Sequence, residues 1–161
     1  MNVAPPPPLA HGAAAAALTL FDQDTPVWLD APLAGAGVAY WLRFHTGAPV
    51  VNDPQQAAFA IVSDPEHAPP FNAFALGTLD YPDRSTTLIL QIESFDDGPL
   101  LTFCGPGIKD RIVFHPRPVP PDFRQRLAAN RALFPRGVDL LLATDAAIAA
   151  LPRSVKLMDD V

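Results

Sequence analysis

The chain has 161 residues, of which 49% are apolar and 17% are charged, and its net charge is −6. This length predicts one domain with a sizeable core. The acidic balance argues against general nucleic-acid binding, and no apolar run reaches the roughly 18 residues of a membrane span. The first 108 residues hold 2 basic and 11 acidic residues, whereas the rest hold 9 basic and 6 acidic residues. The basic last third therefore suits an anionic ligand or an acidic partner.

The start of the chain combines a proline run with an alanine-rich segment. The prolines at 5–8 predict a polyproline-like, mobile start over residues 1–12. Residues 13–21 have high helix propensity and are apolar nearly all round, so this helix should be packed into the core. No lysine or arginine precedes Arg43, whereas a secretory signal needs a basic segment, and we therefore expect a cytoplasmic protein.

Short elements follow, and proline and glycine mark their ends. The expected elements are a strand over 26–29, a helix over 35–44, a strand over 57–62, a short helix over 69–76 and a loop over 77–85. Within the first of these helices we expect three aromatic side chains to face the core: Tyr40, Trp41 and Phe44. Asp53 followed by a proline is typical of a helix start.

The most strongly patterned stretch runs from residue 85 to residue 113. Residues 87–92 are rich in β-branched and aliphatic side chains, which predicts a buried strand. An Asp-Asp-Gly-Pro sequence at 96–99 favours a tight reversal, and residues 100–104 are the expected returning strand. A second break leads into a third strand over 108–114. We therefore predict that this hairpin and third strand form the core of the sheet.

The last part of the chain contains the clearest amphipathic helix, over 121–134, with three apolar side chains on one side: Phe123, Leu127 and Phe134. A buried strand is expected over 138–143. Residues 146–151 fit either a helix or a strand, and the segment that follows them is expected to be extended. Interspersed strands and helices predict an α/β fold, a layered mixed sheet with flanking helices. We expect a single domain over 13–158, followed by a tail over 159–161.

Five motifs in this chain occur in an order that resembles a known family. They are Leu20–Leu29, Leu42–Pro49, Gly105–Ile108, Phe134–Leu140 and Leu151–Arg153. The ordered set is similar to that of PhnH, the H subunit of the bacterial phosphonate carbon–phosphorus lyase system. The resemblance spans the chain from about Ala13 to Lys156. Family members usually carry a further helix and strand before the alanine-rich helix, so either this start is truncated or this branch is short.

The resemblance implies a fold similar to pyridoxal-phosphate-dependent transferases, without the cofactor. It implies a homodimer in isolation and a core complex with the G, I and J subunits. With the G, I and L subunits, the family is assigned to a transferase step. In that step a phosphonate replaces the adenine of ATP at C1 of the ribose, which gives a ribose 1-phosphonate 5-triphosphate. The J subunit then cleaves the carbon–phosphorus bond.

Residue types in the chain limit the chemistry it can support. Pyridoxal phosphate needs a lysine for its Schiff base, and the chain has only Lys109 and Lys156. Neither lysine lies in a cofactor motif, so we expect no pyridoxal phosphate. The four histidines are scattered and no Gly-x-Ser-x-Gly element occurs. Neither a metal site nor a hydrolase triad is therefore predicted.

Arg43 and His45 are the first candidate pair for an anionic ligand. An arginine fork matches phosphonate oxygens, and a histidine adds a donor or moves a proton. Because successive helical residues are turned by about 100°, the two side chains diverge by about 200° unless the helix ends near Phe44. The pair is either a ligand or subunit contact, or a structural pair that ties the helix end to a neighbouring acid.

Further candidates lie at breaks later in the chain. Gly105 and Gly107 either present backbone N–H groups to an anion or form a plain turn, since the proline between them removes one donor. Arg136 and Asp139 form either an ion pair or part of an anion pocket, and Arg153 is a similar candidate. Three arginines form either a solvated face or a docking surface for an acidic neighbouring subunit: Arg124, Arg126 and Arg131.

Two functions are compatible with these residues. In the first, the chain is a non-autonomous subunit that contributes binding surface to an assembly. In the second, it is a stand-alone small-molecule enzyme or phosphonate-binding protein with Arg43, His45 and Arg136 in one cleft. If these three side chains converge, the second function is favoured, and if they scatter, the first is favoured.

Overall fold

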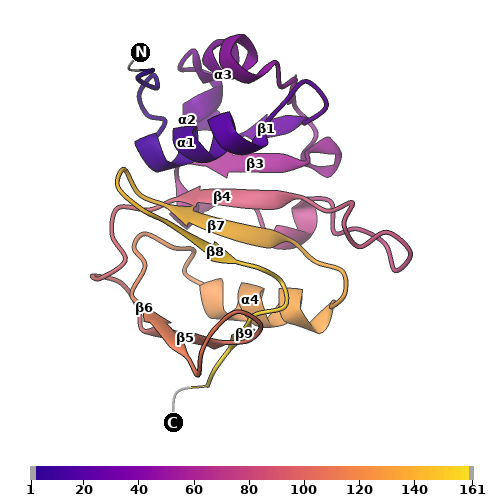
Figure 1. Ribbon diagram of the computed structural model, residues 1–161, viewed down its shortest axis with the longest axis vertical. Coiled ribbons are helices and arrows are strands. Elements are labelled where there is room, and N and C mark those ends of the chain that lie inside the picture. The colour runs from indigo at the N-terminus through magenta and orange to yellow at the C-terminus, as the bar shows by residue number, and fades with distance from the viewer. Residues whose placement is uncertain (1–2, 160–161) are drawn as a thin grey trace.

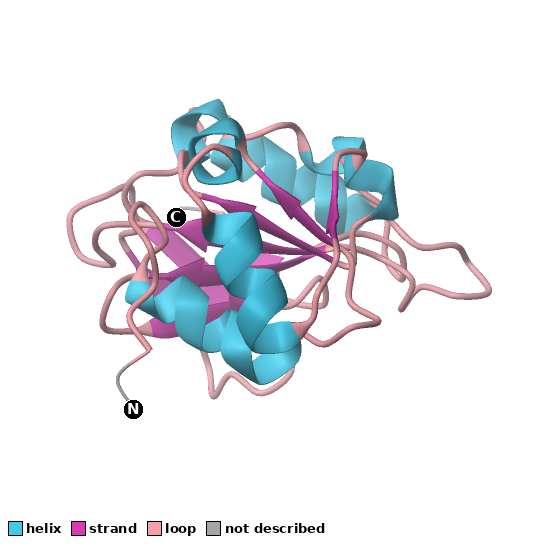
Figure 2. Ribbon diagram, turned by 90° about the horizontal axis from the view of Figure 1, so that it is seen from above, coloured by secondary structure: helices cyan, strands magenta, loops and turns pink. Residues whose placement is uncertain are grey.

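The computed structural model describes residues 3–159, which fold into three layers (Figure 1). A six-stranded sheet forms the middle layer, and three helices cover one of its faces: α1 (His11–Leu20), α2 (Ala31–Ala34) and α3 (Val38–Thr46). Helix α4 (Phe123–Ala132) and a three-stranded sheet cover the other face. Figure 2 shows the same molecule from above, with the strands of the sheet lying among the helices. The predicted α/β class with a mixed sheet and flanking helices is confirmed.

The large sheet has the strand order β2-β1-β3-β4-β7-β8. Its strands are β1 (Val27–Leu29), β2 (Val50–Val51), β3 (Phe59–Val62), β4 (Thr87–Gln91), β7 (Asp139–Ala143) and β8 (Ile148–Leu151). The first five in spatial order run parallel, and β8 is antiparallel to β7. The connections contain three 3-10 helices: η1 (Pro54–Gln56), η2 (Pro65–His67) and η3 (Phe71–Ala73).

The core lies on both faces of the large sheet. On β4, Leu88 and Leu90 join the cluster that contains α4, whereas Ile89 joins the cluster beneath α1, α2 and α3. Each of these three side chains is at most 1% exposed. Because a parallel strand covered on both faces needs apolar side chains at successive positions, the aliphatic run of β4 has a direct explanation.

The predicted central hairpin is wrong. Residues 87–91 form β4, but both of its edges are bonded to parallel strands, β3 on one side and β7 on the other. The expected returning strand, β5 (Leu101–Cys104), therefore has no edge of β4 to join. It lies instead in the small antiparallel sheet with β6 (Ile112–Phe114) and β9 (Lys156–Leu157), in the order β6-β5-β9.

The predicted inward orientation of the α3 aromatic residues is also wrong for two of the three. Trp41 is 9% exposed, but Tyr40 is 73% exposed and Phe44 is 71% exposed. The buried side of α3 consists of Val38, Trp41 and Leu42, which are enough to attach the helix to the core. Similarly, Phe134 lies beyond the end of α4 and is half-exposed, although the sequence placed it on the buried side.

The other element predictions differ mainly at their ends. Four expected elements correspond to β1, β3, α4 and β7; they were predicted over 26–29, 57–62, 121–134 and 138–143. The helix predicted over 69–76 is limited to η3, and α2 was not predicted. The ambiguous segment 146–151 contains β8. Asp53 begins η1 by accepting a hydrogen bond from the backbone N–H of Gln55 at 2.9 Å, as expected of a cap.

The start of the chain is packed against the sheet over the residues that the structure describes. Leu9 is 4% exposed and belongs to the core beneath α1. The side chain of Gln91, at the end of β4, accepts from the N–H of Ala10 at 2.8 Å and donates to the carbonyl of Pro8 at 3.0 Å. Of the expected mobile start, residues 1 and 2 lie outside the described residues, as do residues 160 and 161 of the expected tail.

Candidate functional site

The edge of the large sheet where β1, β3, β4 and β7 end is the first place to look for a ligand; we call it the carboxyl edge. In open α/β sheets, ligands bind beyond this edge, at the point where the chain changes direction across the sheet. Here the later strands β2 and β3 lie on opposite sides of β1, so the change of direction is at β1. Asp30 directly follows β1 and Ser63 directly follows β3.

The carboxylate of Asp30 fills the position between these two strands. It accepts hydrogen bonds from the backbone N–H groups of Ser63 at 2.7 Å and Asp64 at 3.0 Å, and from the hydroxyl of Ser63 at 2.9 Å. Asp30 is 7% exposed. A phosphate or phosphonate bound there would need the same N–H groups and would meet the charge of this carboxylate.

The start of α1, at the same edge, is also bonded to the chain's own groups. The backbone N–H of His11 donates to Asp145 Oδ1 at 2.8 Å, and that of Gly12 donates to the carbonyl of Thr144 at 3.0 Å. The backbone N–H of His11 and then its side chain lower the pKa of Asp145 by hydrogen bonding to the carboxylate. The end of the helix that would attract an anion is thus already occupied by an aspartate.

A hollow of about 440 Å³ remains beside these groups. Its charged lining residues are two acids, Glu93 and Asp145. Arg117 lies 3.3 Å from Glu93, and both side chains of this ion pair are more than half exposed. A hollow lined by two carboxylates repels a phosphonate or a nucleotide triphosphate, so the carboxyl edge is not arranged to hold either ligand by itself.

Asp139 and Arg153, two predicted site residues, form a structural clamp with each other. Arg153 Nη2 lies 2.6 Å from Asp139 Oδ2, its Nε lies 3.1 Å from Oδ1, and its backbone N–H donates to Oδ1 at 2.8 Å. The same guanidinium donates to the carbonyl of Pro82 at 2.6 Å and to the hydroxyl of Ser85. The Arg153 side chain is 13% exposed. These bonds join the start of β7, the end of β8 and the loop before β4, and they use the donors that an anion would require.

Arg136 does not pair with Asp139. Within the described part of the chain, Asp139 forms its ion pair with Arg153, and Arg136 is half-buried with its Nε lacking a hydrogen-bond partner. Of the two alternatives open for this pair, the ion pair between Arg136 and Asp139 is therefore excluded. Arg136 follows α4, on the face of the large sheet opposite to α3.

Arg43 and His45 lie on that opposite layer, in the last turn of α3. The imidazole ring of His45 packs against Trp41, with centroids 4.8 Å apart, and against Phe44 at 4.9 Å. The large sheet lies between α3 and α4, the helix that Arg136 follows (Figure 1). The three side chains that a stand-alone enzyme was expected to gather in one cleft are thus scattered over two faces.

Gly105 and Gly107 lie in the turn that joins β5 to β6. Their φ angles are 146° and 82°, values that side chains other than glycine rarely adopt, so both glycines are needed for the shape of this turn. The backbone N–H of Ile108 donates to the carbonyl of Gly105 at 3.1 Å, which closes the turn. A Cβ on Gly105 would lie 3.1 Å from the Cα of Val155 in the segment before β9. This geometry fits the plain-turn alternative.

The α4 arginines do not form one uniform face. Arg126 is tied down: its side chain is 15% exposed, its Nε contacts Asp122 at 2.7 Å, and its Nη1 donates to the carbonyls of Ala68 and Pro69 at 3.0 and 2.9 Å. Arg131 lies over the ring of Phe134 at 4.6 Å. Arg131 also lines a hollow of about 590 Å³ between α4 and β9, together with two further basic residues: Arg124 and Lys156.

A second hollow near α4, of about 560 Å³, lies beside η3. Its lining is mostly apolar and includes Phe71, Leu76 and Leu133. Asn130, also in the lining, is buried, and its side chain bonds to both the N–H and the carbonyl of Val138 at 2.9 Å. Over residues 3–159, no cluster of three or more histidine, cysteine, aspartate or glutamate side chains is placed to hold a metal ion.

Comparison with known proteins adds what this geometry leaves open. The family model described as bacterial phosphonate metabolism protein (PhnH) matches residues 1–158. The chain belongs to the PhnH family. It is 47% identical over 154 residues to the alpha-D-ribose 1-methylphosphonate 5-triphosphate synthase subunit PhnH of Rhizobium meliloti (strain 1021), an alignment that covers 96% of this chain and 77% of the relative. The resemblance seen in the five motifs is confirmed.

A second relative is more distant. The putative C-P lyase subunit protein HtxG of Stutzerimonas stutzeri is 33% identical over 82 residues, which is 51% of this chain and 42% of that protein. Both relatives carry the word subunit in their names. Across residues 3–159, every helix is too short or too polar to cross a bilayer.

Sequence reasoning missed the residues that close the carboxyl edge: Asp30, Gln91, Thr144 and Asp145. Asp30 had a local signal, since it follows an apolar strand and precedes Ala-Pro at the start of a short helix. Gln91, Thr144 and Asp145 bond to the start of α1, which is far from all three in the sequence. Gln91, for example, is 81 residues from its partner Ala10. No local pattern reports a contact of that range.

Proposed function

We propose that this PhnH family member is a non-autonomous subunit of the assembly that makes alpha-D-ribose 1-methylphosphonate 5-triphosphate, and that it serves the breakdown of organophosphonates by the carbon–phosphorus lyase system. The 47% identity to a subunit of that synthase supports the reaction. The observation that carries the non-autonomous role is the scatter of the candidate residues: Arg43 and His45 lie on one face of the large sheet and Arg136 on the other.

The reaction needs groups that this chain does not bring together. A phosphonate oxygen forms a bond to C1 of the ribose while the bond from C1 to adenine breaks, so two highly anionic reactants must be held side by side. At the carboxyl edge, Asp30 and Asp145 occupy the N–H groups that would bind such anions. The neighbouring subunits would therefore supply most of the anion-binding groups, and this chain would supply surface and support.

A fold similar to pyridoxal-phosphate-dependent transferases, without the cofactor, is part of the proposal. A largely parallel sheet between two covering layers supports the fold. The positions of the two lysines support the missing cofactor: Lys156 is on β9 of the small sheet, Lys109 is in the loop between β5 and β6, and both are exposed. Neither is on the carboxyl edge, where a Schiff base would be needed.

The proposed partners are the G, I and J subunits of the lyase system, with a homodimer of this chain when it is isolated. The subunit names of both relatives support an assembly. The need for ATP as a reactant supports the expected cytoplasmic location.

Two measurements test this function. Tagged chain co-expressed with the G, I and J subunits should retain them through affinity purification and gel filtration. The purified chain alone, incubated with ATP and methylphosphonate, should release no adenine above the level of a protein-free control. Robust release of adenine by the chain alone would overturn the non-autonomous role and favour a stand-alone enzyme.

A further inference from the structure

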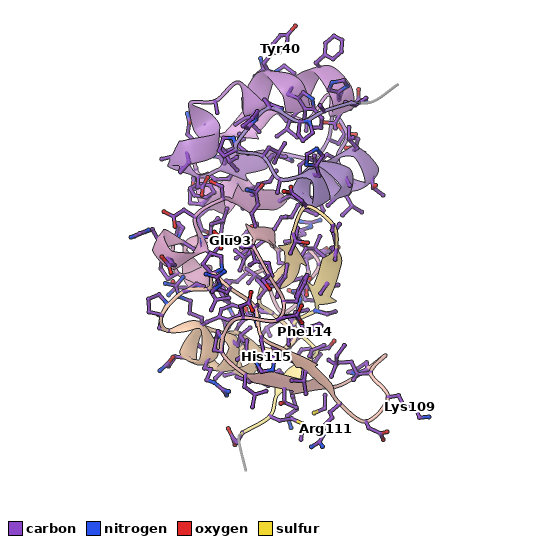
Figure 3. The ribbon with its side chains drawn as sticks, turned by 90° about the vertical axis from the view of Figure 1, so that its left-hand side faces the viewer. Tyr40, Glu93, Lys109, Arg111, Phe114 and His115 are labelled. Carbon is purple, nitrogen blue, oxygen red and sulfur yellow. The ribbon has the colours of Figure 1, made fainter. Side chains whose placement is uncertain are left out.

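Helix α3 displays two aromatic side chains that the fold of the chain does not use. Tyr40 and Phe44 are 73% and 71% exposed, and their rings lie 6.2 Å apart with planes inclined by 23°. In Figure 3, Tyr40 lies at one end of the molecule and points away from it. Large aromatic side chains bury roughly 150–250 Å² each when covered, so this pair leaves a substantial apolar area in contact with water.

Arg43 lies on the same outward side of the helix. Because each residue turns the helix by about 100°, the residues at 40, 43 and 44 fall within a sector of about 100°. Arg43 is exposed, and within residues 3–159 its side chain forms neither a hydrogen bond nor an ion pair. We call Tyr40, Arg43 and Phe44 the α3 ridge.

The helix is held in place without the α3 ridge. Val38, Trp41 and Leu42 attach it to the core, with Val38 and Leu42 fully buried. Its end is closed by Gly47, which has a φ of 77° and donates to the carbonyl of Arg43 at 2.9 Å. Folding does not require the exposed rings, and tyrosine and arginine are among the residues most enriched at the energetic centres of protein interfaces.

We infer that the α3 ridge docks the chain onto another subunit of the synthase, on a surface that offers an apolar groove bordered by carboxylates. This inference rests on the proposed function. Helix α3 contains arginine and histidine and no carboxylate, although the chain as a whole has a net charge of −6. A partner therefore needs acidic groups to match Arg43 and an apolar groove to receive the two rings.

A second copy of this chain fits the ridge less well. In a two-fold contact centred on the ridge, the ridge packs against its own copy, so both Arg43 side chains would lie within one small interface. Like charges at an interface oppose association. Charge complementarity thus favours a different chain as the occupant.

The test is the affinity of the chain for a purified assembly of the G, I and J subunits, measured by biolayer interferometry at two salt concentrations. Two ridge variants are compared with wild type: the double variant Tyr40→Ala with Phe44→Ala, and the charge reversal Arg43→Glu. Two controls carry equivalent changes elsewhere. Leu79→Ala removes a side chain that is 73% exposed in the loop before β4. Lys109→Glu reverses a charge at the opposite end of the molecule from Tyr40 (Figure 3).

We expect each ridge variant to raise Kd by at least about 30-fold, as loss of an interface hot spot does. Both controls should stay within about 3-fold of wild type, and thermal unfolding should show that every variant is folded. Because Arg43 contributes through charge, the wild-type affinity should fall with salt more steeply than that of Arg43→Glu.

The other outcomes separate this inference from the proposed function. If wild type binds the assembly and the ridge variants bind equally well, the ridge inference is wrong while the subunit role stands. If the ridge variants lose only self-association in sedimentation velocity, the ridge contacts a second copy and the inference is overturned. If wild type does not bind the assembly at all, the proposed function itself fails.

Discussion

Replacement of Arg153 by methionine separates a structural clamp from a ligand site. Methionine keeps most of the length and apolar body of the side chain and removes the guanidinium. In the structure this removes the contact to Asp139 at 2.6 Å, the bond to the carbonyl of Pro82 at 2.6 Å and the bond to Ser85. Asp139 keeps one partner, the backbone N–H of residue 153 at 2.8 Å.

The size of the effect depends on how well water replaces the lost contacts. Removing one partner of a buried ion pair costs about 3–5 kcal/mol, because the other charge stays buried and unpaired. The Arg153 side chain is 13% exposed and that of Asp139 is 32% exposed. Water therefore rehydrates part of the Asp139 carboxylate, and we expect the free energy of unfolding to fall by roughly 2–4 kcal/mol.

The assay is urea unfolding followed by circular dichroism at pH 7, with Arg117→Met as the matched control. Arg117 also forms an ion pair, but its side chain and that of Glu93 are 52% and 69% exposed. Such a surface pair contributes at most about 1 kcal/mol, so the control should change stability little.

A contrary result is easy to recognise. If Arg153→Met unfolds at the same urea concentration as wild type while the assembled synthase loses affinity for methylphosphonate, Arg153 is a ligand residue and the clamp is the wrong explanation. An equal loss of stability in both arginine variants would show that burial does not decide the effect.

Three further predictions concern the carboxyl edge. In Gly12→Ala the new Cβ would lie 2.1 Å from the carbonyl oxygen of Thr144, so thermal unfolding should show a loss of stability of about 1–3 kcal/mol. The control Gly35→Ala places its Cβ in open space and should leave the stability unchanged or slightly raised. The pKa of Asp145 is lowered in the folded state from its usual 3.8. The ionised carboxylate therefore stabilises the fold above pH 3.8, and this stabilisation is lost as the pH falls through the lower pKa of the folded state. The difference in Tm between wild type and Asp145→Asn should shrink as the pH is lowered over this interval. Asp30→Ala leaves two backbone N–H groups and a hydroxyl without their acceptor, so urea unfolding should show that the free energy of unfolding falls by about 2–4 kcal/mol. If millimolar phosphate then stabilises this variant, the carboxylate of Asp30 occupies an anion-binding position in the wild type.

Local signals in the sequence were enough to find the long elements of this fold. The alanine-rich run became α1, the amphipathic run became α4 and the aliphatic runs became β4 and β7. Which strands pair is not a local property. A strand with a continuous aliphatic run, such as β4, is equally compatible with an antiparallel hairpin and with a position between two parallel neighbours, and only the rest of the chain decides between them.

The candidate site shows the same limit for side chains. The sequence singles out Arg153 as a candidate for an ion pair or an anion pocket, but its partner Asp139 is 14 residues away and the other groups of the clamp come from the loop before β4. For Tyr40 and Phe44 the apolar character was read as burial in the core of the chain itself. That reading fails wherever an apolar side chain is kept for contact with another molecule, because hydrophobic patterning does not distinguish the two kinds of burial.

The most direct test of the subunit role is a titration of the chain into the remaining subunits of the synthase, with adenine release from ATP and methylphosphonate as the readout. The account predicts that the rate rises with added chain and levels off at a fixed subunit ratio, while the chain alone releases nothing. A full rate in the absence of the chain, or release of adenine by the chain without its partners, would contradict it.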